Sequence, residues 1–327
     1  MRLVGIDVGG TFTDFILWDG RDVRTHKVPS SPRDPAKAVE RGLRELLPDG
    51  PASIVHGCTL ATNAFLQRRG ARVALLTTKG FEDLLEIGRQ NRGRLYDFDW
   101  TPPEPLVPRS RRIGVEERIG PDGRVLIPLK RAARTLNGAD AVAICFLHSY
   151  ANPSHERLAA RGIRKPLTLS SDLAPEYREY ERLATTVLNA YVMPVMDRYL
   201  RDLSRRTRGR DLRIMVSNGG QTTPAVAARE PVRTLLSGPA GGAVAVSHLC
   251  RRLAIARAIA FDMGGTSTDV SVYEDGIDLT REGSIGGFPI RVPILDMHTA
   301  GAGGGSIARF DAGGALRVGP ESAGADP

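Results

Sequence analysis

The 327 residues suffice for two domains, and 41% hydrophobic with 25% charged residues is ordinary for a globular protein. No apolar run is long enough to span a membrane, and three widely separated cysteines give no disulfide framework, so a cytoplasmic location is expected. The net charge of +8 comes from arginines spread along the chain without interleaved aromatic residues, which argues against a nucleic-acid partner.

The first residues predict a strand, a turn and two further strands. "RLVGIDV" is apolar and β-prone, "GGT" is a turn, "FTDFILW" alternates, and Asp19-Gly20 turns the chain into "DVRTHKV". A helix is predicted over 34–47, with Asp34 as its N-cap. A buried strand at 53–57, a helix at 59–70, a strand at 72–78 and a short helix at 81–87 follow.

The middle of the chain is less regular. Residues 97–125 are rich in Pro and Arg and lack periodicity, so they are predicted to form a surface excursion. The apolar run at 141–149 indicates a buried strand, and 176–207 indicates a helix kinked at Pro194. After the strand "LRIMVSNGG" and the small-residue segment "SGPAGGAVAVSHL", the opening pattern returns as "RAIAFDM", "GGT", "STDVSVY" and "IDLTREG".

"IDVGGTFTD" at 6–14 and "FDMGGTSTD" at 261–269 are two copies of one Gly-rich turn. One copy alone could be a plain hairpin, but consecutive backbone N–H groups without side chains also bind phosphate oxygens. Two copies predict that one nucleotide is gripped from both sides. A third Gly-rich stretch, "GAGGGSI" at 301–307, is either a loop against the nucleotide or a simple turn. The predicted nucleotide-binding residues are Gly9, Gly10, Thr11, Thr13, Gly264, Gly265, Thr266, Thr268, Gly303, Gly304 and Gly305.

Asp7 and Asp262 each end a strand immediately before one of these turns. A carboxylate in that place can act at the transferred phosphoryl group and can hold Mg²⁺ through water. Both residues are therefore predicted to be catalytic and to bind the metal, with ATP and Mg²⁺ as cofactors.

Longer stretches carry a resemblance to a known family. They include "GIDVGGTFTD", "HGCTLATNAFLQRRGARVALLTTKGFEDLLEIGRQ", "AFDMGGTSTDVSV" and "DMHTAGAGGGSIARFDAGGALRVGPESAGADP". Together they resemble the hydantoinase A / 5-oxoprolinase family of the actin / Hsp70 / sugar-kinase superfold. The resemblance implies an α/β fold with two related actin-like (ribonuclease H-like) domains, 1–175 and 176–327, each opening with a βββ phosphate-binding hairpin. Because the family continues past "GPESAGADP", the second domain is expected to be incomplete.

The resemblance also implies an activity. Members use ATP to phosphorylate the carbonyl oxygen of a cyclic amide, such as a hydantoin or 5-oxoproline, so that the ring can be opened. Other members are subunits of ATP-dependent ketone carboxylases. A hydantoinase B-type partner subunit and an oligomer are expected. A small-molecule kinase and a nucleotide-binding regulator of the same superfold are the alternatives.

Five residues are predicted to contact the substrate. His56, Thr59 and Asn63 sit where a predicted strand gives way to a helix, and in α/β folds ligands favour the carboxyl ends of strands. A buried His and a helix cap would give the same pattern. Arg89 and Asn91 lie in a polar cluster that could clamp a carbonyl or carboxylate, or could be a solvated loop.

Overall fold

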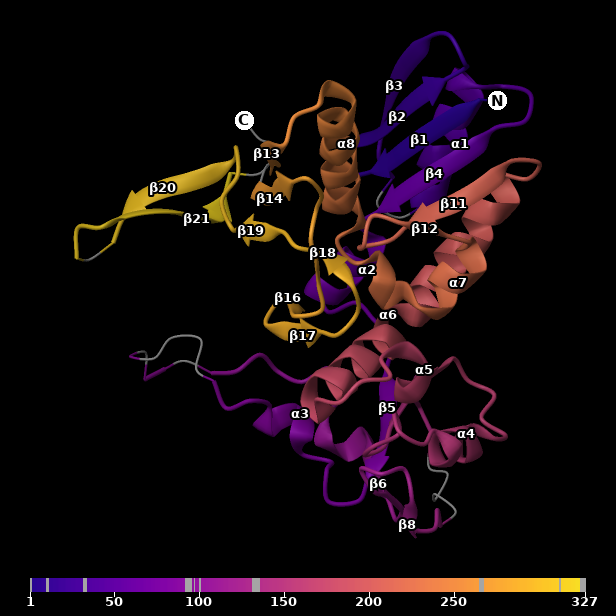
Figure 1. The fold of residues 1–327 in the computed structure, drawn as a ribbon, viewed down its shortest axis with the longest axis vertical. Coiled ribbons are helices and arrows are strands. Elements are labelled where there is room, and N and C mark those ends of the chain that lie inside the picture. Colours follow the sequence, from indigo (N-terminus) through magenta and orange to yellow (C-terminus); the bar gives the residue numbers. More distant parts are fainter. Residues whose placement is uncertain are drawn as a thin grey trace.

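The computed structural model describes residues 2–9, 12–31, 34–91, 96, 98–99, 101–130, 136–264, 268–311 and 313–323. Of the predicted site, Gly10, Thr11, Gly265 and Thr266 lie outside the described residues. The fold is a mixed α/β arrangement with parallel and antiparallel sheets (Figure 1). No helix in the described part of the chain has both the length and the apolar character that a membrane crossing requires.

The largest sheet has six strands in the order β12-β11-β4-β1-β2-β3. These strands are β1 (Leu3–Val8), β2 (Phe12–Trp18), β3 (Val23–Pro29), β4 (Ser53–Cys58), β11 (Asp211–Met215) and β12 (Gln221–Thr222). β1 pairs antiparallel with β2 and parallel with β4. The alternation along β1 and β2 directs one set of side chains into the core and leaves Asp7 on the opposite face.

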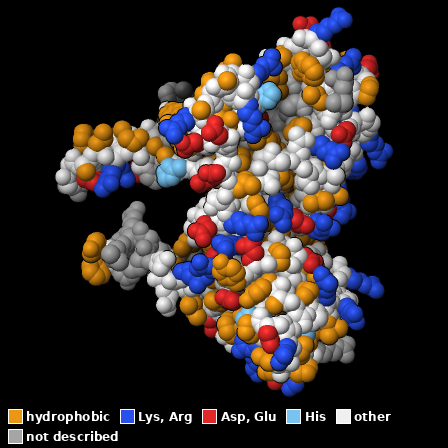
Figure 2. Space-filling model, viewed as in Figure 1, with side chains coloured by type: hydrophobic (Ala, Val, Ile, Leu, Met, Phe, Trp, Pro, Cys, Tyr) orange, Lys and Arg blue, Asp and Glu red, His pale blue; other side chains and the backbone are white. Residues whose placement is uncertain are grey.

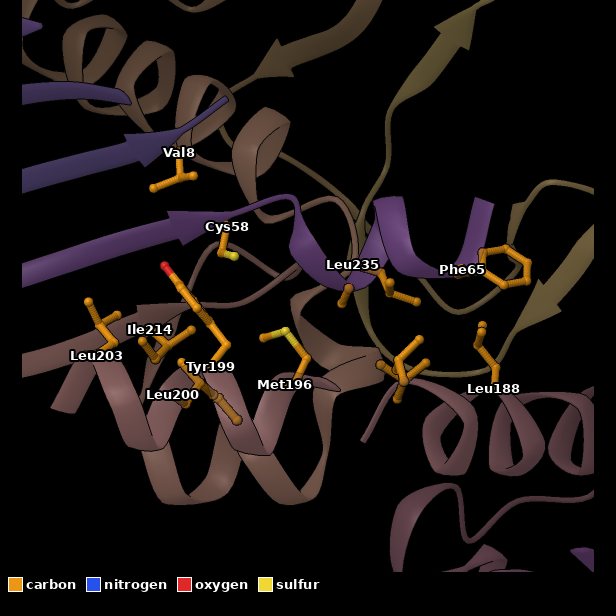
Figure 3. Close-up of a cluster of buried hydrophobic side chains, with 14 of the residues drawn as sticks. Val8, Cys58, Phe65, Leu188, Met196, Tyr199, Leu200, Leu203, Ile214 and Leu235 are labelled. Carbon is orange, nitrogen blue, oxygen red and sulfur yellow. The ribbon is translucent and has the colours of Figure 1, made fainter. Parts of the chain in front are cut away.

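Two helices cover the core face of this sheet, α1 (Pro35–Leu46) and α6 (Glu179–Arg206). α1 begins as predicted at Asp34, whose carboxylate accepts a hydrogen bond from the Lys37 N–H, and α6 continues through Pro194. Figure 3 shows Val8 and Cys58 of the sheet facing Met196 and Tyr199 of α6. The apolar face of α1 and the buried side chains of α6 therefore build much of the main core.

A smaller sheet lies below α6 in Figure 1. Its order is β10-β9-β5-β6, all parallel, with β5 (Val73–Thr78), β6 (Arg112–Val115), β9 (Ala141–Cys145) and β10 (Leu167–Leu169). The helices of this part are α3 (Leu84–Ile87), α4 (Ser154–Ala160) and α5 (Ser170–Leu173), whereas α2 (Leu60–Leu66) packs against α6 and η2 (Pro231–Thr234), above α6 in Figure 1.

The predicted surface excursion at 97–125 is only partly on the surface. It holds η1 (Arg109–Arg111), β6 and β7 (Arg118–Ile119) and leads into β8 (Val125–Ile127). Val107, Val115 and Ile119 are buried. The sequence did not predict β6, because a strand of four residues shows no periodicity and an arginine is usually exposed. The guanidinium of Arg112 is instead buried and donates to the Val107 carbonyl at 2.9 Å.

The sheets do not divide at residue 175. β11 pairs in parallel with β4, so residues 211–222 complete the first sheet, and 60–175 are inserted between β4 and α6. α7 (Pro224–Arg229) and η2 (Pro231–Thr234) pack beside α6. The division into 1–175 and 176–327 stays a prediction about domains, but strands from both sides of it share one sheet.

The second copy of the hairpin starts a three-stranded sheet after α8 (Ser237–Leu253). Its strands are β13 (Arg257–Met263), β14 (Thr268–Glu274) and β19 (His298–Ala300). β13 and β14 pair Asp262 with Asp269, as β1 and β2 pair Asp7 with Asp14. The strand predicted around 277–283 does not join them: β15 (Leu279–Thr280) pairs with β18 (Ile294–Leu295), and β16 (Gly283–Ile285) pairs with β17 (Phe288–Ile290). The third strand of this sheet is instead β19, which pairs antiparallel with β14.

The last strands form an arm. β20 (Ser306–Phe310) and β21 (Leu316–Ser322) pair with each other and project away from the rest of the chain (Figure 1). Figure 2 shows hydrophobic side chains along one side of the arm, where Phe310, Leu316 and Val318 are exposed.

Candidate functional site

A cavity of about 790 Å³ opens between the first sheet and α8. It lies on the sheet face opposite α1 and α6, and both Asp7 of β1 and Asp262 of β13 line it. Asp14, Lys27 and Gly238 line it as well. The two predicted catalytic carboxylates are therefore brought to one cavity, although they are far apart in the sequence.

The charges in this cavity act on one another. Asp7, Asp14 and Lys27 are neighbours across β1, β2 and β3, and Lys27 Nζ lies 2.9 Å from Asp14 Oδ1. The pKa of Asp7 is raised, first by desolvation between the cavity walls and then by the negative charges of Asp14 and Asp262. Asp262, which lines the same cavity, is the last of these contributions to the raised pKa of Asp7.

Backbone approaches the Asp7 carboxylate closely because glycines surround it. A Cβ at Gly57 would lie 3.5 Å from Asp7 Oδ1, and one at Gly238 would lie 3.9 Å from the same atom. Gly238 is in the first turn of α8, so the positive end of that helix dipole lies beside Asp7. At the turn itself the Gly9 N–H donates to the Phe12 carbonyl at 3.0 Å.

The hydroxyls of Thr13 and Thr268 hold loops in place. Thr13 is buried with its Oγ1 3.0 Å from Ser30 Oγ, and Ser30 donates to the Gly9 carbonyl at 2.8 Å. Thr268 donates to the Ala302 carbonyl at 2.6 Å. Each threonine thus fixes the backbone of a Gly-rich segment.

The late Gly-rich loop packs against the second hairpin. The Gly304 N–H donates to the Gly264 carbonyl at 2.9 Å, the Gly303 N–H donates to Ser306 Oγ at 2.8 Å, and Gly305 accepts from the Ala323 N–H at 2.8 Å. These glycines are assembled with Gly264, while Gly9 belongs to the first hairpin. Their role in nucleotide binding stays a prediction.

The predicted substrate residues do not form one group. His56 is fully buried on the core face, with Nε2 2.7 Å from the Tyr199 hydroxyl, and burial lowers its pKa to about 4. It points away from the cavity because residues 54, 56 and 58 of β4 alternate toward α6. Arg89 is held by the Glu181 carboxylate at 2.6 and 2.8 Å, and Asn91 is exposed.

Thr59 and Asn63 lie nearer to the first hairpin. Thr59 donates to the Val8 carbonyl at 3.1 Å, at the end of β1, and Asn63 Nδ2 donates to Thr59 Oγ1 at 3.3 Å. Their roles, like those of Arg89 and Asn91, stay predictions.

Sequence reasoning did not single out Lys27 or Ser237 for the site. Lys27 gives no local signal, because only the pairing of β2 and β3 sets it beside Asp14. Ser237 begins α8 and hydrogen-bonds the Cys58 backbone, with Oγ 3.3 Å from N and 3.2 Å from O. The small residues of "SGPAGGAVAVSHL" indicate close backbone packing from the sequence alone, but they do not indicate which segment α8 packs against.

Comparison with known proteins identifies the family. The model of the hydantoinase/oxoprolinase N-terminal region matches residues 3–167, and the hydantoinase/oxoprolinase model matches residues 182–327. The chain belongs to the hydantoinase/oxoprolinase family. This family includes ATP-dependent hydrolases and ketone carboxylase subunits.

Family members resemble the chain over almost its whole length. An uncharacterised protein of Methanocaldococcus jannaschii is 40% identical over 99% of this chain and 53% of its own. The crystal structure of ATP-dependent caprolactamase from Pseudomonas jessenii superposes with a TM-score of 0.87 and 35% identity, over 99% of this chain and 51% of that one. The nucleotide-free structure of acetone carboxylase superposes with a TM-score of 0.81 and 31% identity, over 99% of this chain and 52% of that one. The chain thus spans about half the length of each of these three relatives.

Proposed function

We propose that this chain carries the ATP site of an enzyme that phosphorylates the carbonyl oxygen of a cyclic amide, so that the ring can be opened. One observation carries the proposal: two related hairpins bring Asp7 and Asp262 to a single cavity. The likeness to an ATP-dependent caprolactamase supports the substrate class, because caprolactam is itself a cyclic amide.

The groups around the cavity suit the phosphates of ATP. Lys27 supplies a positive charge on the cavity wall, and the two Gly-rich turns directly follow Asp7 and Asp262, which line the cavity. The first turn of α8 adds the positive end of a helix dipole near Asp7. Phosphate would add negative charge beside the carboxylates, so a cation would have to bind together with it.

The carboxylates fit Mg²⁺ held mainly through water. In the described residues no three His, Cys, Asp or Glu side chains converge as a metal site. Mg²⁺ keeps several waters and takes few protein ligands, so two carboxylates could hold it. Asp7 and Asp262 would hold it, and the ion would neutralise charge on the phosphates.

The chemistry follows from the weakness of an amide as an electrophile. Its nitrogen delocalises into the carbonyl, and phosphorylation of the oxygen removes that resonance and creates a leaving group. In this proposal Asp7 and Asp262 align the phosphoryl group and its hydration, and Lys27 and α8 stabilise negative charge. Ring hydrolysis itself would be completed with a hydantoinase B-type partner.

Ketone carboxylation is the second candidate, because the acetone carboxylase structure matches 99% of this chain. The same site would then activate an oxygen of the ketone or of bicarbonate, and the products would differ.

A screen of ATP turnover tests the proposal. The complete protein, with its B-type partner, is assayed with hydantoins, 5-oxoproline, caprolactam and ketones with bicarbonate. Stimulation by a cyclic amide, with ADP, phosphate and an opened ring as products, is the expected result. Stimulation by a ketone only would favour carboxylation, a stable phosphoester would indicate a kinase, and absence of ATP binding would overturn both candidates.

A further inference from the structure

The first Gly-rich turn begins where β1 stops pairing with β4. The last residue pair of these two strands is Val8 with Cys58, and α2 follows directly after β4 (Figure 3). Thr59 occupies the N-cap position of α2, where a threonine hydroxyl normally accepts a hydrogen bond from the helix backbone. Its side chain makes no such bond, and its Oγ1 instead donates to the Val8 carbonyl at 3.1 Å. The hydroxyl of Thr59 therefore serves the end of β1 and not its own helix.

A second hydroxyl holds the next carbonyl along the chain. Ser30 Oγ donates to the Gly9 carbonyl at 2.8 Å. Because this bond uses the only hydroxyl hydrogen of Ser30, the 3.0 Å contact between Ser30 Oγ and Thr13 Oγ1 has Thr13 as its donor. Thr59 is arranged in the same way, since Asn63 Nδ2 donates to its Oγ1 at 3.3 Å. Each hydroxyl thus accepts one hydrogen bond while it donates another to a carbonyl, and such linked bonds strengthen each other.

The second hairpin holds the equivalent carbonyl by other means. When Asp7 is aligned with Asp262, Gly9 corresponds to Gly264, whose carbonyl accepts from the Gly304 N–H at 2.9 Å. The two donors are unrelated, a serine hydroxyl in one copy and a glycine backbone in the other. The feature that both hairpins share is that this carbonyl of the turn is fixed.

A fixed carbonyl has a consequence in a turn that binds phosphate. The backbone N–H groups of such a turn attract phosphate oxygens, whereas a carbonyl oxygen that rotated toward them would repel them. A turn whose carbonyls are already held also loses less conformational freedom when its ligand binds. Hydroxyls that hold the Val8 and Gly9 carbonyls would therefore raise the affinity for a phosphate-bearing ligand without contacting it.

We propose that Thr59 and Ser30 are positioning residues, which hold the carbonyls of Val8 and Gly9 away from the phosphates of ATP. The inference rests on the proposed function, in which this turn binds the nucleotide. It gives Thr59, together with Asn63, a role at the ATP site in place of contact with the ring substrate.

Separate measurements of nucleotide and substrate affinity test the proposal. The complete enzyme with its B-type partner is assayed for the Kd of MgATP and, at saturating MgATP, for the KM of the substrate that the turnover screen identifies. Thr59→Val keeps the shape of the side chain and removes its hydroxyl, and Ser30→Ala removes the other hydroxyl. Each should weaken MgATP binding about 10-fold, as expected for one lost hydrogen bond that leaves a carbonyl unheld. The KM of the substrate should change by less than about 2-fold, because no contact with it is removed.

The controls separate the hydroxyl from the packing of the side chain. Thr59→Ser restores the hydroxyl and should return the Kd to within about 2-fold of the parent value. Ser53→Ala removes a hydroxyl at the opposite end of β4, where Ser53 donates to Asp211 Oδ2 at 3.2 Å, and should leave the Kd unchanged. Ser30→Ala belongs to a separate pair of hydrogen bonds, so it decides the question if Thr59→Val does not fold.

The outcomes distinguish this inference from the proposed function. A parent enzyme that does not bind MgATP would overturn both. A parent that binds MgATP, with Thr59→Val and Ser30→Ala binding it equally well, would overturn the positioning role alone. So would a loss of affinity that Thr59→Ser fails to restore. A raised KM for the substrate with an unchanged Kd for MgATP would also overturn it, and would assign Thr59 to the substrate.

Discussion

In the first hairpin Asp14 faces Lys27 on β3, whereas in the second hairpin the equivalent Asp269 accepts a hydrogen bond from Thr299 on β19 at 2.6 Å. The two segments share six residues of one motif and the same strand register. Their third strands come from unrelated sequence. A repeated motif therefore duplicates the local backbone, while the charges that surround it are set by whichever strand packs alongside.

The same contrast extends to the two sheets. The first has helices on its core face and the second, among the described residues, has that face open. Paired substitutions at equivalent positions can therefore separate what the motif does from what its surroundings do.

The largest expected difference is in stability. Leu17→Ala should lower the free energy of unfolding by about 2–5 kcal/mol, because it leaves a cavity in the core. Val272→Ala, its counterpart, should change that free energy by no more than about 0.5 kcal/mol in this chain, because the side chain is already exposed. Urea unfolding of both variants measures the comparison. Equal losses would show that the second face is covered in solution.

The two hairpins should matter equally for catalysis. Asp7→Asn and Asp262→Asn should each reduce substrate-dependent ATP turnover by about 10²-fold or more, the order found when a transition-state interaction is lost. Asp14→Asn and Asp269→Asn serve as matched controls and should reduce turnover less, since each lies one strand away. Turnover is measured in the complete enzyme, with circular dichroism as a check on folding. Near wild-type rates for both Asp7→Asn and Asp262→Asn would refute the twin-hairpin mechanism.

Asp7 should also destabilise the fold at neutral pH. Its pKa is raised from 3.8 in the folded chain, so the folded state favours its protonated form. The contribution of Asp7 to stability is then fully present below pH 3.8 and is lost as the pH rises through the folded pKa. Asp7→Asn should accordingly have a higher Tm than the parent at pH 7, and the difference should shrink toward pH 3. A lower Tm at pH 7 would contradict the desolvation of Asp7 and its repulsion by Asp14 and Asp262.

The smallest expected effect is a shift in pH dependence. Asp14→Asn removes one of the negative charges that raise the pKa of Asp7, so that pKa should fall. If turnover requires ionised Asp7, the acidic limb of the kcat/KM profile should move to lower pH. Asp22→Asn, exposed near the β2–β3 turn, is the control and should leave the limb in place. No shift with Asp14→Asn would mean that another group governs the limb.

Much of the fold could be predicted because its signals act within a few residues. The strands β1 and β2, the Asp34 cap of α1 and the helix α6 all follow from alternation, capping or helical spacing. Of the candidate site, Asp7 and Asp262 could be named from the repeat, but Lys27 and the first turn of α8 could not, because their place depends on pairing with segments distant in sequence.

The sequence by itself determined the two hairpins, their acidic residues and the family. Only the tertiary structure decided that His56 faces Tyr199 in the core, that β6 is an edge strand and that β11 completes the first sheet. It also decided that Asp7 and Asp262 share one cavity and that, among the described residues, helices cover the core face of the first sheet but leave that of the second open. Local patterns specify which way a side chain points from its own strand, but what it meets there is set by long-range packing, which leaves no periodicity in the residues that take part.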